Sequence, residues 1–364
     1  MRARITPALS LLKDAALSNI QVGVPMNTET KVKTLILTAE QVEKLLEMKD
    51  VIDAVEGAFR FKGLGKVQMP PKVYLDFTKY SGDLRTMPSY VEDLDIAAVK
   101  IVNVHANNFK EHGMRTVMAT LLLVDPRTGA PLAFMDATHI TGLRTGAASA
   151  VASKYLAKKN PRTVGMVGAG NQAKTQLLAL LTQYGGFESV RICDMVSERA
   201  WEMAKEFRHK YKDILPDIVA VPSPKDCVQG ADIVVTATPS RKPLVMDEWV
   251  SKGTHFNCIG ADAPGKQEMD PMILKRSRLV IDDWEQASHS GEINVPLHAG
   301  LLSRKEIHAE IGQIVAGLRP GRESEGEITV FCSTGLAVQD CVTAKLVFDA
   351  AIKSKVGTYM QILP

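Results

Sequence analysis

Residues 163–173 read TVGMVGAGNQA, a short apolar run that turns through glycines into an amphipathic segment. The apolar run predicts a buried β-strand, and the segment after it predicts an α-helix. Between them, Gly168, Gly170 and Ala173 match the pattern G-x-G-x-x-G/A. Gly168 permits a tight turn, Gly170 has no Cβ to keep a ligand from the backbone, and Ala173 lets helix and strand pack closely. This stretch therefore predicts the first βα unit of a doubly wound sheet.

The same turn predicts a dinucleotide site, because free N–H groups and partial positive charge at a helix start favour a diphosphate. The second predicted strand ends at Asp194. A carboxylate there can accept hydrogen bonds from both ribose hydroxyls and would repel a 2′-phosphate, which favours NAD over NADP. Arg191 and Arg199 lie close by in the sequence and keep NADP open as an alternative.

From Thr163 onward, short apolar strands alternate with helical patterns, which predicts a parallel sheet with crossover helices. The strands read TVGMVG, SVRICD, DIVAV, DIVVTAT, THFNCIG and RLVIDD. Ligands of such sheets bind beyond the carboxyl ends of the strands. Polar segments follow strands four to six there: ATPSRKP with Thr238 and Ser240, GADAPGKQE with Asp262 and Lys266, and DDWEQASHSGE. We expect Thr238 and Ser240 to lie near the ribose.

The residues before this region predict an α+β domain with a mostly antiparallel sheet. A strand, KTLILT, leads to a helix capped by Thr38 with Gln41 at the capping-box position. Several β-type segments follow, and residues 138–158 predict one long Ala-rich helix that packs closely on its neighbours. Residues 303–318 also predict a helix.

The last helix has no partner left in the sequence order of the parallel sheet, so we expect it to return to the first domain. The nucleotide domain is then an insertion. This organisation predicts a substrate and dimerisation domain over 32–145 plus 326–364, an inserted nucleotide domain over 146–325, and a disordered extension over 1–31.

Composition narrows the classes of partner. The net charge of +3, with signs mixed along the chain, argues against nucleic acid or an anionic membrane as a partner. No apolar stretch approaches the ~18 residues that a membrane span needs. The five cysteines show no CxxC pairing and the eight histidines no ligand spacing, so we expect no disulfides, no metal site and a cytoplasmic location.

From about Val32 to its end, the chain resembles the ornithine cyclodeaminase/mu-crystallin family. The matching stretches read QMPPKVYL, DLRTMPSY, VKIVNVH, MDATHITGLRTGAA, GAGNQA, TPSRKP, IGADAPGKQE, HSGEINVPL and STGLAVQD. Several of them look closest to the archaeal-type alanine dehydrogenase branch. The resemblance implies a homodimer, with a Rossmann-type NAD domain inserted into the substrate and dimerisation domain.

The resemblance also implies roles for individual residues. Arg85 would bind the substrate carboxylate, Lys100 would be the acid/base or a second carboxylate anchor, and Asp262 would meet the substrate amine and the attacking water. Further substrate contacts are implied for Lys72 and Thr334. The cofactor contacts implied are Thr116, Arg144, Asn171, Gln172, Lys266 and Ser333, in addition to Gly168, Gly170, Asp194, Thr238 and Ser240.

These roles suit the chemistry of amino-acid oxidation. A carboxylate is held best by the fork of an arginine. The amine must be neutral before a hydride leaves Cα, so a base is needed within hydrogen-bond reach, and Lys100 could serve if burial beside Arg85 lowers its pKa. Asp262 can stabilise the cationic iminium and orient water.

Each residue also has a structural interpretation. Arg85 or Lys100 could be a strand residue whose charge reaches solvent, Arg144 a surface charge on its helix, and Asp262 a turn former.

The leading functional hypothesis is an NAD-dependent dehydrogenase that deaminates a small L-amino acid, L-alanine to pyruvate and ammonia. Ornithine cyclodeamination to proline with recycled NAD is the nearest alternative, followed by reduction of pyrroline- or ketimine-type substrates. A non-catalytic nucleotide-binding protein, as in the crystallin branch, is disfavoured by Asp262 within GADAPGK.

Overall fold

The computed structural model describes residues 31–363 and divides into two compact units. The first unit contains 31–61, 65–141 and 337–363, and the second contains 62–64 and 142–336. The chain thus leaves the first unit and returns to it for its last helix, as the sequence predicts. The extension expected over 1–31 lies outside the described residues, except for Lys31.

The first unit is built on an eight-stranded sheet in the order β18-β1-β7-β6-β5-β4-β2, with β3 also paired to β4. All of its pairings are antiparallel except β1 with β7. The mostly antiparallel sheet is therefore confirmed. Its strands are β1 (Lys33–Leu37), β2 (Val67–Gln68), β3 (Val73–Phe77), β4 (Gly82–Val91), β5 (Ile96–His105), β6 (Val117–Val124), β7 (Pro131–Asp136) and β18 (Thr358–Gln361).

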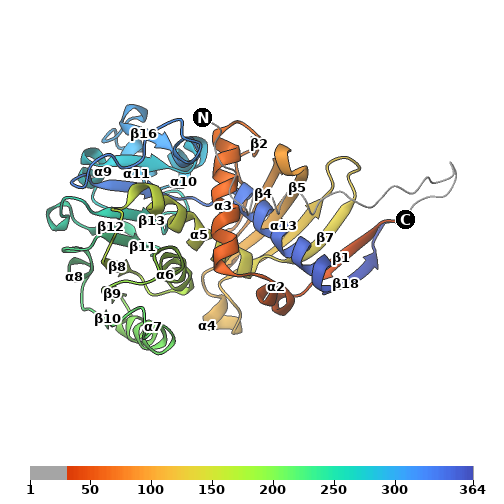
Figure 1. The fold of residues 1–364 in the computed structure, drawn as a ribbon, viewed down its shortest axis with the longest axis horizontal. Helices are drawn as coiled ribbons and strands as arrows, with labels where there is room; N and C mark the ends of the chain where they lie inside the picture. The colour runs from red at the N-terminus through yellow and green to blue at the C-terminus, as the bar shows by residue number, and fades with distance from the viewer. Residues whose placement is uncertain (1–30, 364) are drawn as a thin grey trace. The chain divides into compact units, whose positions relative to one another are not determined.

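The last helix of the first unit packs against the middle strands of its sheet. Helix α13 (Ala337–Ser354) packs against β4 and β5, and Figure 1 shows it crossing the strands. Helix α2 (Ala39–Leu45) begins at Thr38, whose hydroxyl accepts from the Gln41 N–H in the predicted capping box. The other helices are α3 (Met48–Gly63), α4 (Asn108–His112) and the short η1 (Thr78–Tyr80) and η2 (Glu92–Leu94).

The second unit contains the predicted parallel sheet, with strand order β10-β9-β8-β11-β13-β17-β15-β16. Every pairing in it is parallel. Its strands are β8 (Thr163–Val167), β9 (Ser189–Cys193), β10 (Asp217–Ala220), β11 (Ile233–Thr236), β13 (His255–Cys258), β15 (Arg278–Ile281), β16 (Ile307–Glu310) and β17 (Thr329–Cys332). A small separate sheet pairs β12 (Arg241–Val245) with β14 (Gln267–Met269).

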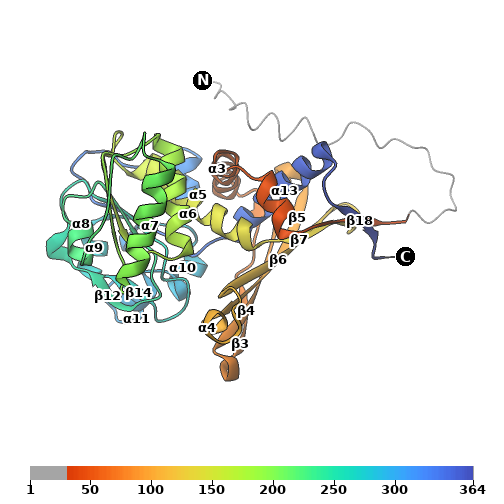
Figure 2. The same cartoon turned by 90° about the horizontal axis from the view of Figure 1, so that it is seen from below.

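Helices cover both faces of the parallel sheet, each over its own apolar core. One core is packed by α6 (Asn171–Tyr184) and α7 (Ser197–Lys210), and the other by α8 (Pro224–Val228) and α9 (Pro271–Arg276). Figure 2 shows these two pairs of helices on opposite sides of the unit. The remaining helices are α5 (Thr138–Leu156), α10 (Trp284–Ser290), α11 (Asn294–His298), α12 (Ile311–Val315), η3 (Asp247–Trp249) and η4 (Arg304–Glu306). The doubly wound Rossmann-type fold is therefore confirmed.

Two details of the sequence prediction are wrong. Residues 62–64, 142–145 and 326–336, all assigned to the first domain, belong to the second unit. For 326–336 the reason is that β17 pairs between β13 and β15. Sequence order alone gives no sign that the last strand inserts there. The helix predicted over 303–318 is broken into η4, β16 and α12, because backbone pairing with β15 overrides the local helical pattern.

The long Ala-rich helix α5 packs as closely as its composition predicts. A Cβ added at Gly146 would lie only 2.4 Å from the carbonyl oxygen of Thr175 on α6. Such an approach is open only to glycine, so α5 and α6 are held in direct backbone contact.

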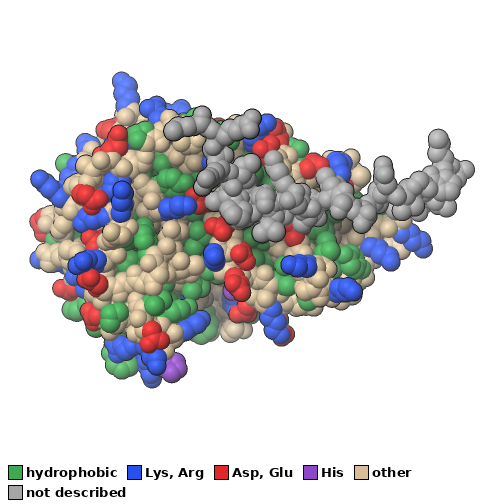
Figure 3. All heavy atoms as spheres, viewed as in Figure 1, with side chains coloured by type: hydrophobic (Ala, Val, Ile, Leu, Met, Phe, Trp, Pro, Cys, Tyr) green, Lys and Arg blue, Asp and Glu red, His purple; other side chains and the backbone are tan. Residues whose placement is uncertain are grey.

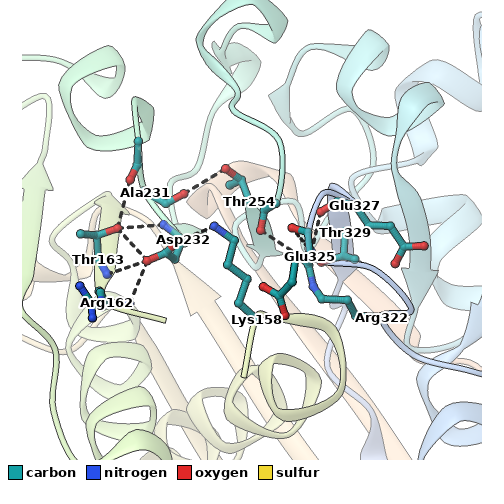
Figure 4. Close-up of polar contacts among 12 residues, drawn as sticks. Lys158, Arg162, Thr163, Ala231, Asp232, Thr254, Arg322, Glu325, Glu327 and Thr329 are labelled. Carbon is teal, nitrogen blue, oxygen red and sulfur yellow. Dashed lines mark hydrogen bonds and ion pairs between the residues drawn. The ribbon is translucent and has the colours of Figure 1, made fainter. Parts of the chain in front are cut away.

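Polar residues tie the amino-terminal edge of the parallel sheet together (Figure 4). The guanidinium of Arg322 donates to the carbonyl oxygens of Leu156 at 2.7 Å, Glu327 at 2.7 Å and Gly253 at 3.1 Å. It also donates to the Thr329 hydroxyl at 3.2 Å. Arg322 thereby caps the carboxyl end of α5 and joins it to the starts of β13 and β17.

Replacing Arg322 with alanine is expected to destabilise the protein by about 3 kcal/mol or more, because several carbonyl oxygens lose a charged donor. Urea unfolding measures this change. The control is Arg319→Ala, since Arg319 is exposed three residues away and should unfold like the wild type. Equal free energies of unfolding for the two variants would contradict the role of Arg322 in joining α5 to β13 and β17.

The described surface is mixed in charge, and Figure 3 shows Lys and Arg side chains interspersed with Asp and Glu. Among residues 31–363, no helix has the length and apolar character to cross a bilayer. All five cysteines are unpaired and buried. Within the same residues, no cluster of three or more His, Cys, Asp or Glu side chains is placed to hold a metal ion.

Candidate functional site

The glycine turn after β8 has the geometry that a dinucleotide requires. Gly168 adopts a φ of +106°, and a Cβ there would lie 2.7 Å from the carbonyl oxygen of Ala237. Gly170 has an ordinary φ of −76°, and a Cβ there would meet no atom within 4 Å. The fold therefore requires glycine at 168 but not at 170. The open space at Gly170 fits a ligand that approaches the backbone.

The start of α6 offers unsatisfied donors beside this space. Gly170 is its N-cap and supplies no side-chain hydrogen bond to the first turn. Asn171 is exposed at the first position of the helix. The Oε1 atom of Gln172 is buried without a hydrogen-bond partner among the described residues, but it is an acceptor and adds no donor to the turn. Backbone N–H groups at a helix start bind phosphate oxygens, so this turn fits the diphosphate of NAD.

Asp194 braces the glycine turn from the end of β9. Its carboxylate accepts from the Ala169 N–H at 2.8 Å and from the Val196 N–H at 2.9 Å. A carboxylate has about four lone-pair positions, so Asp194 can hold the turn and still accept from a ribose.

The loops after β11 and β13 carry four of the predicted residues. Thr238 donates through its hydroxyl to Glu268 at 2.7 Å, and the Ser240 N–H donates to the Thr238 hydroxyl at 3.3 Å. The ammonium of Lys266 pairs with the Asp262 carboxylate, whose side chain remains 35% exposed. The Asp262 carboxylate is therefore accessible to solvent and pairs with a cation. Neither feature is needed if Asp262 only stabilises a turn.

The turn after β17 is organised by a buried carboxylate that the sequence analysis did not single out. Asp282 accepts from the N–H groups of Thr334 at 2.6 Å and Gly335 at 3.0 Å. The N–H of Ser333 donates to the Cys258 carbonyl at 3.0 Å. Gly335, with a φ of +78°, also makes room for Arg144, because a Cβ there would lie 2.4 Å from its Nη1. Arg144 is thus buried at this turn and is not a surface charge.

In the first unit, Arg85 is held on the buried face of β4. Its Nε donates to Asp83 at 2.8 Å and its Nη2 donates to the other carboxylate oxygen at 3.0 Å. The guanidinium also lies 5.3 Å from the centre of the Tyr74 ring. Only 7% of Arg85 is exposed, so it is oriented inside the unit and does not decorate a strand end.

Lys100 lies on the same face of the sheet, one strand away on β5. Its ammonium is 2.7 Å from the Asp340 carboxylate of α13 and 3.3 Å from the Thr141 hydroxyl. Lys100 and Asp340 are both buried, as a buried charge requires a counter-charge. This carboxylate partner of Lys100 was not expected from the sequence.

The two remaining predicted residues of the first unit are less buried. Lys72 is half-buried just before β3, and Thr116 is exposed before β6, where its carbonyl accepts from the His105 N–H at 2.9 Å.

Five acidic residues were not predicted individually: Asp83, Asp282, Asp340, Glu268 and Glu292. Asp83 could have been found from strand periodicity, because residues two apart share a face. Asp282 and Glu292 lie within the polar segment DDWEQASHSGE, and Glu268 lies within GADAPGKQE. Each of the other four binds a partner distant in the chain, so no local pattern distinguishes it from its neighbours.

Known proteins resemble this chain over nearly all of its length. The family model for the ornithine cyclodeaminase/mu-crystallin family matches residues 32–355. An alanine dehydrogenase from Archaeoglobus fulgidus is 48% identical over 90% of this chain and 98% of its own length.

Solved structures resemble the chain over similar lengths. An archaeal alanine dehydrogenase dimer with bound NAD has a TM-score of 0.86 and 46% identity, covering 91% of this chain and all of its own. A Δ1-pyrroline-2-carboxylate reductase from Thermococcus litoralis, in complex with NADH and L-proline, has a TM-score of 0.85 and 40% identity. It covers 89% of this chain and 99% of its own.

Proposed function

Because the chain belongs to the ornithine cyclodeaminase/mu-crystallin family, we propose that it oxidises a small L-amino acid with NAD, converting L-alanine to pyruvate and ammonia. The observation that carries this proposal is the 48% identity to an alanine dehydrogenase along 98% of that enzyme. The open space at Gly170 supports the cofactor part of it.

The first unit supplies the substrate anchor in this proposal. Arg85, oriented by Asp83, binds the substrate carboxylate through its guanidinium fork. Lys100 adds a second positive charge, and Lys72 assists. Since Asp340 already pairs with Lys100, removing a proton from Lys100 means removing it from an ammonium beside a carboxylate. We therefore propose that Lys100 helps to hold the substrate carboxylate and does not act as the acid/base.

The second unit supplies the polar chemistry. When bound, NAD accepts the hydride from the substrate Cα. Asp262 accepts a proton from the substrate ammonium, which leaves the amine neutral. It also stabilises the positive charge of the substrate iminium and orients the water that hydrolyses it. Lys266 holds the Asp262 carboxylate in place and touches the cofactor. Thr334, fixed by Asp282, contacts the substrate.

The cofactor contacts follow the turn and the loops beside it. Asn171 and Gln172 line the phosphates, Asp194, Thr238 and Ser240 face the ribose, and Thr116, Arg144 and Ser333 complete the set.

We also propose a homodimer formed through the first unit. The sheet face opposite α13 carries half-exposed apolar side chains, including Leu75 and Phe134, which are 54% and 41% exposed. Exposed apolar side chains on one face of a sheet suit that face to pairing with a second copy. The archaeal relative at 46% identity is a dimer.

Five unpaired thiols agree with a cytoplasmic location.

A second candidate is reduction of a cyclic imine such as Δ1-pyrroline-2-carboxylate, favoured by the 40% identity to a reductase of that substrate. A spectrophotometric panel separates the candidates. Net NADH formation with alanine supports the deaminase, and NADH consumption with the pyrroline alone supports the reductase. Ornithine turned into proline and ammonia without NADH accumulation would indicate a cyclodeaminase. Parallel assays with NADP test the cofactor choice.

Arg85→Ala is expected to raise KM for the amino acid about a hundredfold while NAD affinity stays the same, because only the substrate loses a charged partner. The matched control is Arg127→Ala, since Arg127 also pairs with an aspartate two residues before it but is exposed. A loss of NAD affinity with unchanged KM would contradict the assignment.

A further inference from the structure

One buried carboxylate bridges two loops of the candidate site. Glu268 in β14 accepts from the N–H and the hydroxyl of Thr238, both at 2.7 Å, through Oε1. Its Oε2 accepts from the Gly260 N–H at 2.9 Å. Glu268 is fully buried. A single side chain thus joins the turn after β11 to the turn after β13.

The backbone is shaped around this bridge. A Cβ at Gly260 would lie 2.1 Å from the Thr238 carbonyl oxygen and 2.5 Å from Oε2 of Glu268. Only glycine allows the two turns and the carboxylate to come this close. Gly260 is two residues before Asp262, so the bridge fixes the backbone that carries Asp262.

A second clamp holds the other side of the same segment. Oε1 of Glu292 accepts from the N–H groups of Glu268 at 2.9 Å and Met269 at 2.8 Å. Asn294 accepts from the Gly265 N–H through Oδ1 and donates from Nδ2 to the Lys266 carbonyl, both at 3.0 Å. The segment that contains Asp262 and Lys266 is therefore fastened at both ends.

We propose that Glu268, Glu292 and Asn294 are positioning residues that set the geometry of Asp262 and Thr238 for catalysis. The inference rests on the proposed function, in which Asp262 acts on the substrate and Thr238 on the cofactor. None of the three positioning side chains needs to touch either ligand.

Burying the carboxyl groups of Glu268 and Glu292 costs free energy, which supports a functional role for these two residues. Burial raises the pKa of Glu268 despite its hydrogen-bond donors, and burial together with the Glu268 charge raises the pKa of Glu292 well above its usual value. Oε2 of Glu292 has no hydrogen-bond partner among the described residues. Apolar side chains would fill such a place without this penalty, and unfavourable buried charges of this kind gather at functional sites.

The test compares Glu268→Gln with the matched control Asp232→Asn. Asp232 also binds backbone N–H groups, those of Arg162 at 2.8 Å and Thr163 at 3.2 Å, but at the amino-terminal edge of the sheet (Figure 4). Each substitution keeps the side-chain size and replaces an acceptor oxygen with an amide nitrogen. Both variants should therefore lose thermal stability.

Only Glu268→Gln should change function. We expect kcat to fall about tenfold or more, because small misplacements of catalytic groups cost that much. Hydrogen–deuterium exchange of the unliganded protein should accelerate at 237–240 and 259–266 in this variant alone. KM for the amino acid, set by the first unit, should stay near the wild-type value.

Equal kcat and equal exchange in these loops for Glu268→Gln and Asp232→Asn would overturn the inference. If Glu268→Gln does not fold, Asn294→Ala is the second variant, and it should lower kcat and accelerate exchange at 262–266. A wild-type protein that oxidises no amino acid would refute the proposed function instead. The exchange pattern still decides the positioning role in that case.

Discussion

Replacing Asp262 with asparagine is expected to lower kcat by about a thousandfold while NAD binding is retained. Asparagine keeps the size of the side chain but cannot take a proton or balance the charge of an iminium, and general acid–base groups contribute about 10²–10⁴ to a rate. We expect kcat and kcat/KM to fall together, the pattern of an interaction made in the transition state. Steady-state kinetics and titration with NAD measure the two quantities.

The control for this substitution is Asp270→Asn, in the same segment of the chain. Asp270 caps α9 by accepting from the Met272 N–H at 2.9 Å, and asparagine can do the same. Its turnover should match the wild type. Stability should change little in Asp262→Asn, because the ion pair with Lys266 is partly exposed and such pairs contribute at most about 1 kcal/mol. Normal turnover in Asp262→Asn would remove the residue from the mechanism.

Gly170→Asp is expected to weaken NAD binding strongly without harming the fold. The backbone at Gly170 is extended and has open space where a side chain would lie, and aspartate is a good N-cap for α6. Thermal stability should therefore stay equal or rise. The new carboxylate would fill the place of the diphosphate and repel it, and we expect affinity for NAD to fall about a hundredfold or more.

The control for this variant is Thr38→Asp, which places the same charge at the N-cap of α2 in the first unit. It should bind NAD like the wild type, as calorimetric titration would show. Unchanged NAD affinity in Gly170→Asp would mean that the diphosphate does not lie over this turn.

Local patterns predicted the parts of the fold that depend on near neighbours. The glycine turn could be predicted because its strand, the turn and the start of its helix lie in one run of eleven residues, 163–173. The pairing of Asp262 with Lys266 lies within one short loop, and both residues were singled out. The capping box of Thr38 and Gln41 is likewise confirmed, since capping depends on the first turn of the helix alone.

Long-range pairings could not be predicted in the same way. Lys100 and Asp340 form an ion pair because α13, which follows the second unit in the sequence, packs against β5. No local sequence pattern predicts this contact. Glu268 lies in the predicted polar segment GADAPGKQE but was not singled out, because its role depends on Thr238 and Gly260 approaching in space. The position of β17 between β13 and β15 was missed for the same reason: it is decided by pairing between strands.

The central claim is that a hydride leaves Cα of a small L-amino acid and stays on NAD. Incubation with L-alanine deuterated at C2, followed by mass spectrometry of the reduced cofactor, tests it directly. The account predicts deuterium in NADH, together with equal amounts of pyruvate and ammonia. Unlabelled cofactor and no pyruvate from alanine, with proline formed from ornithine under the same conditions, would contradict it.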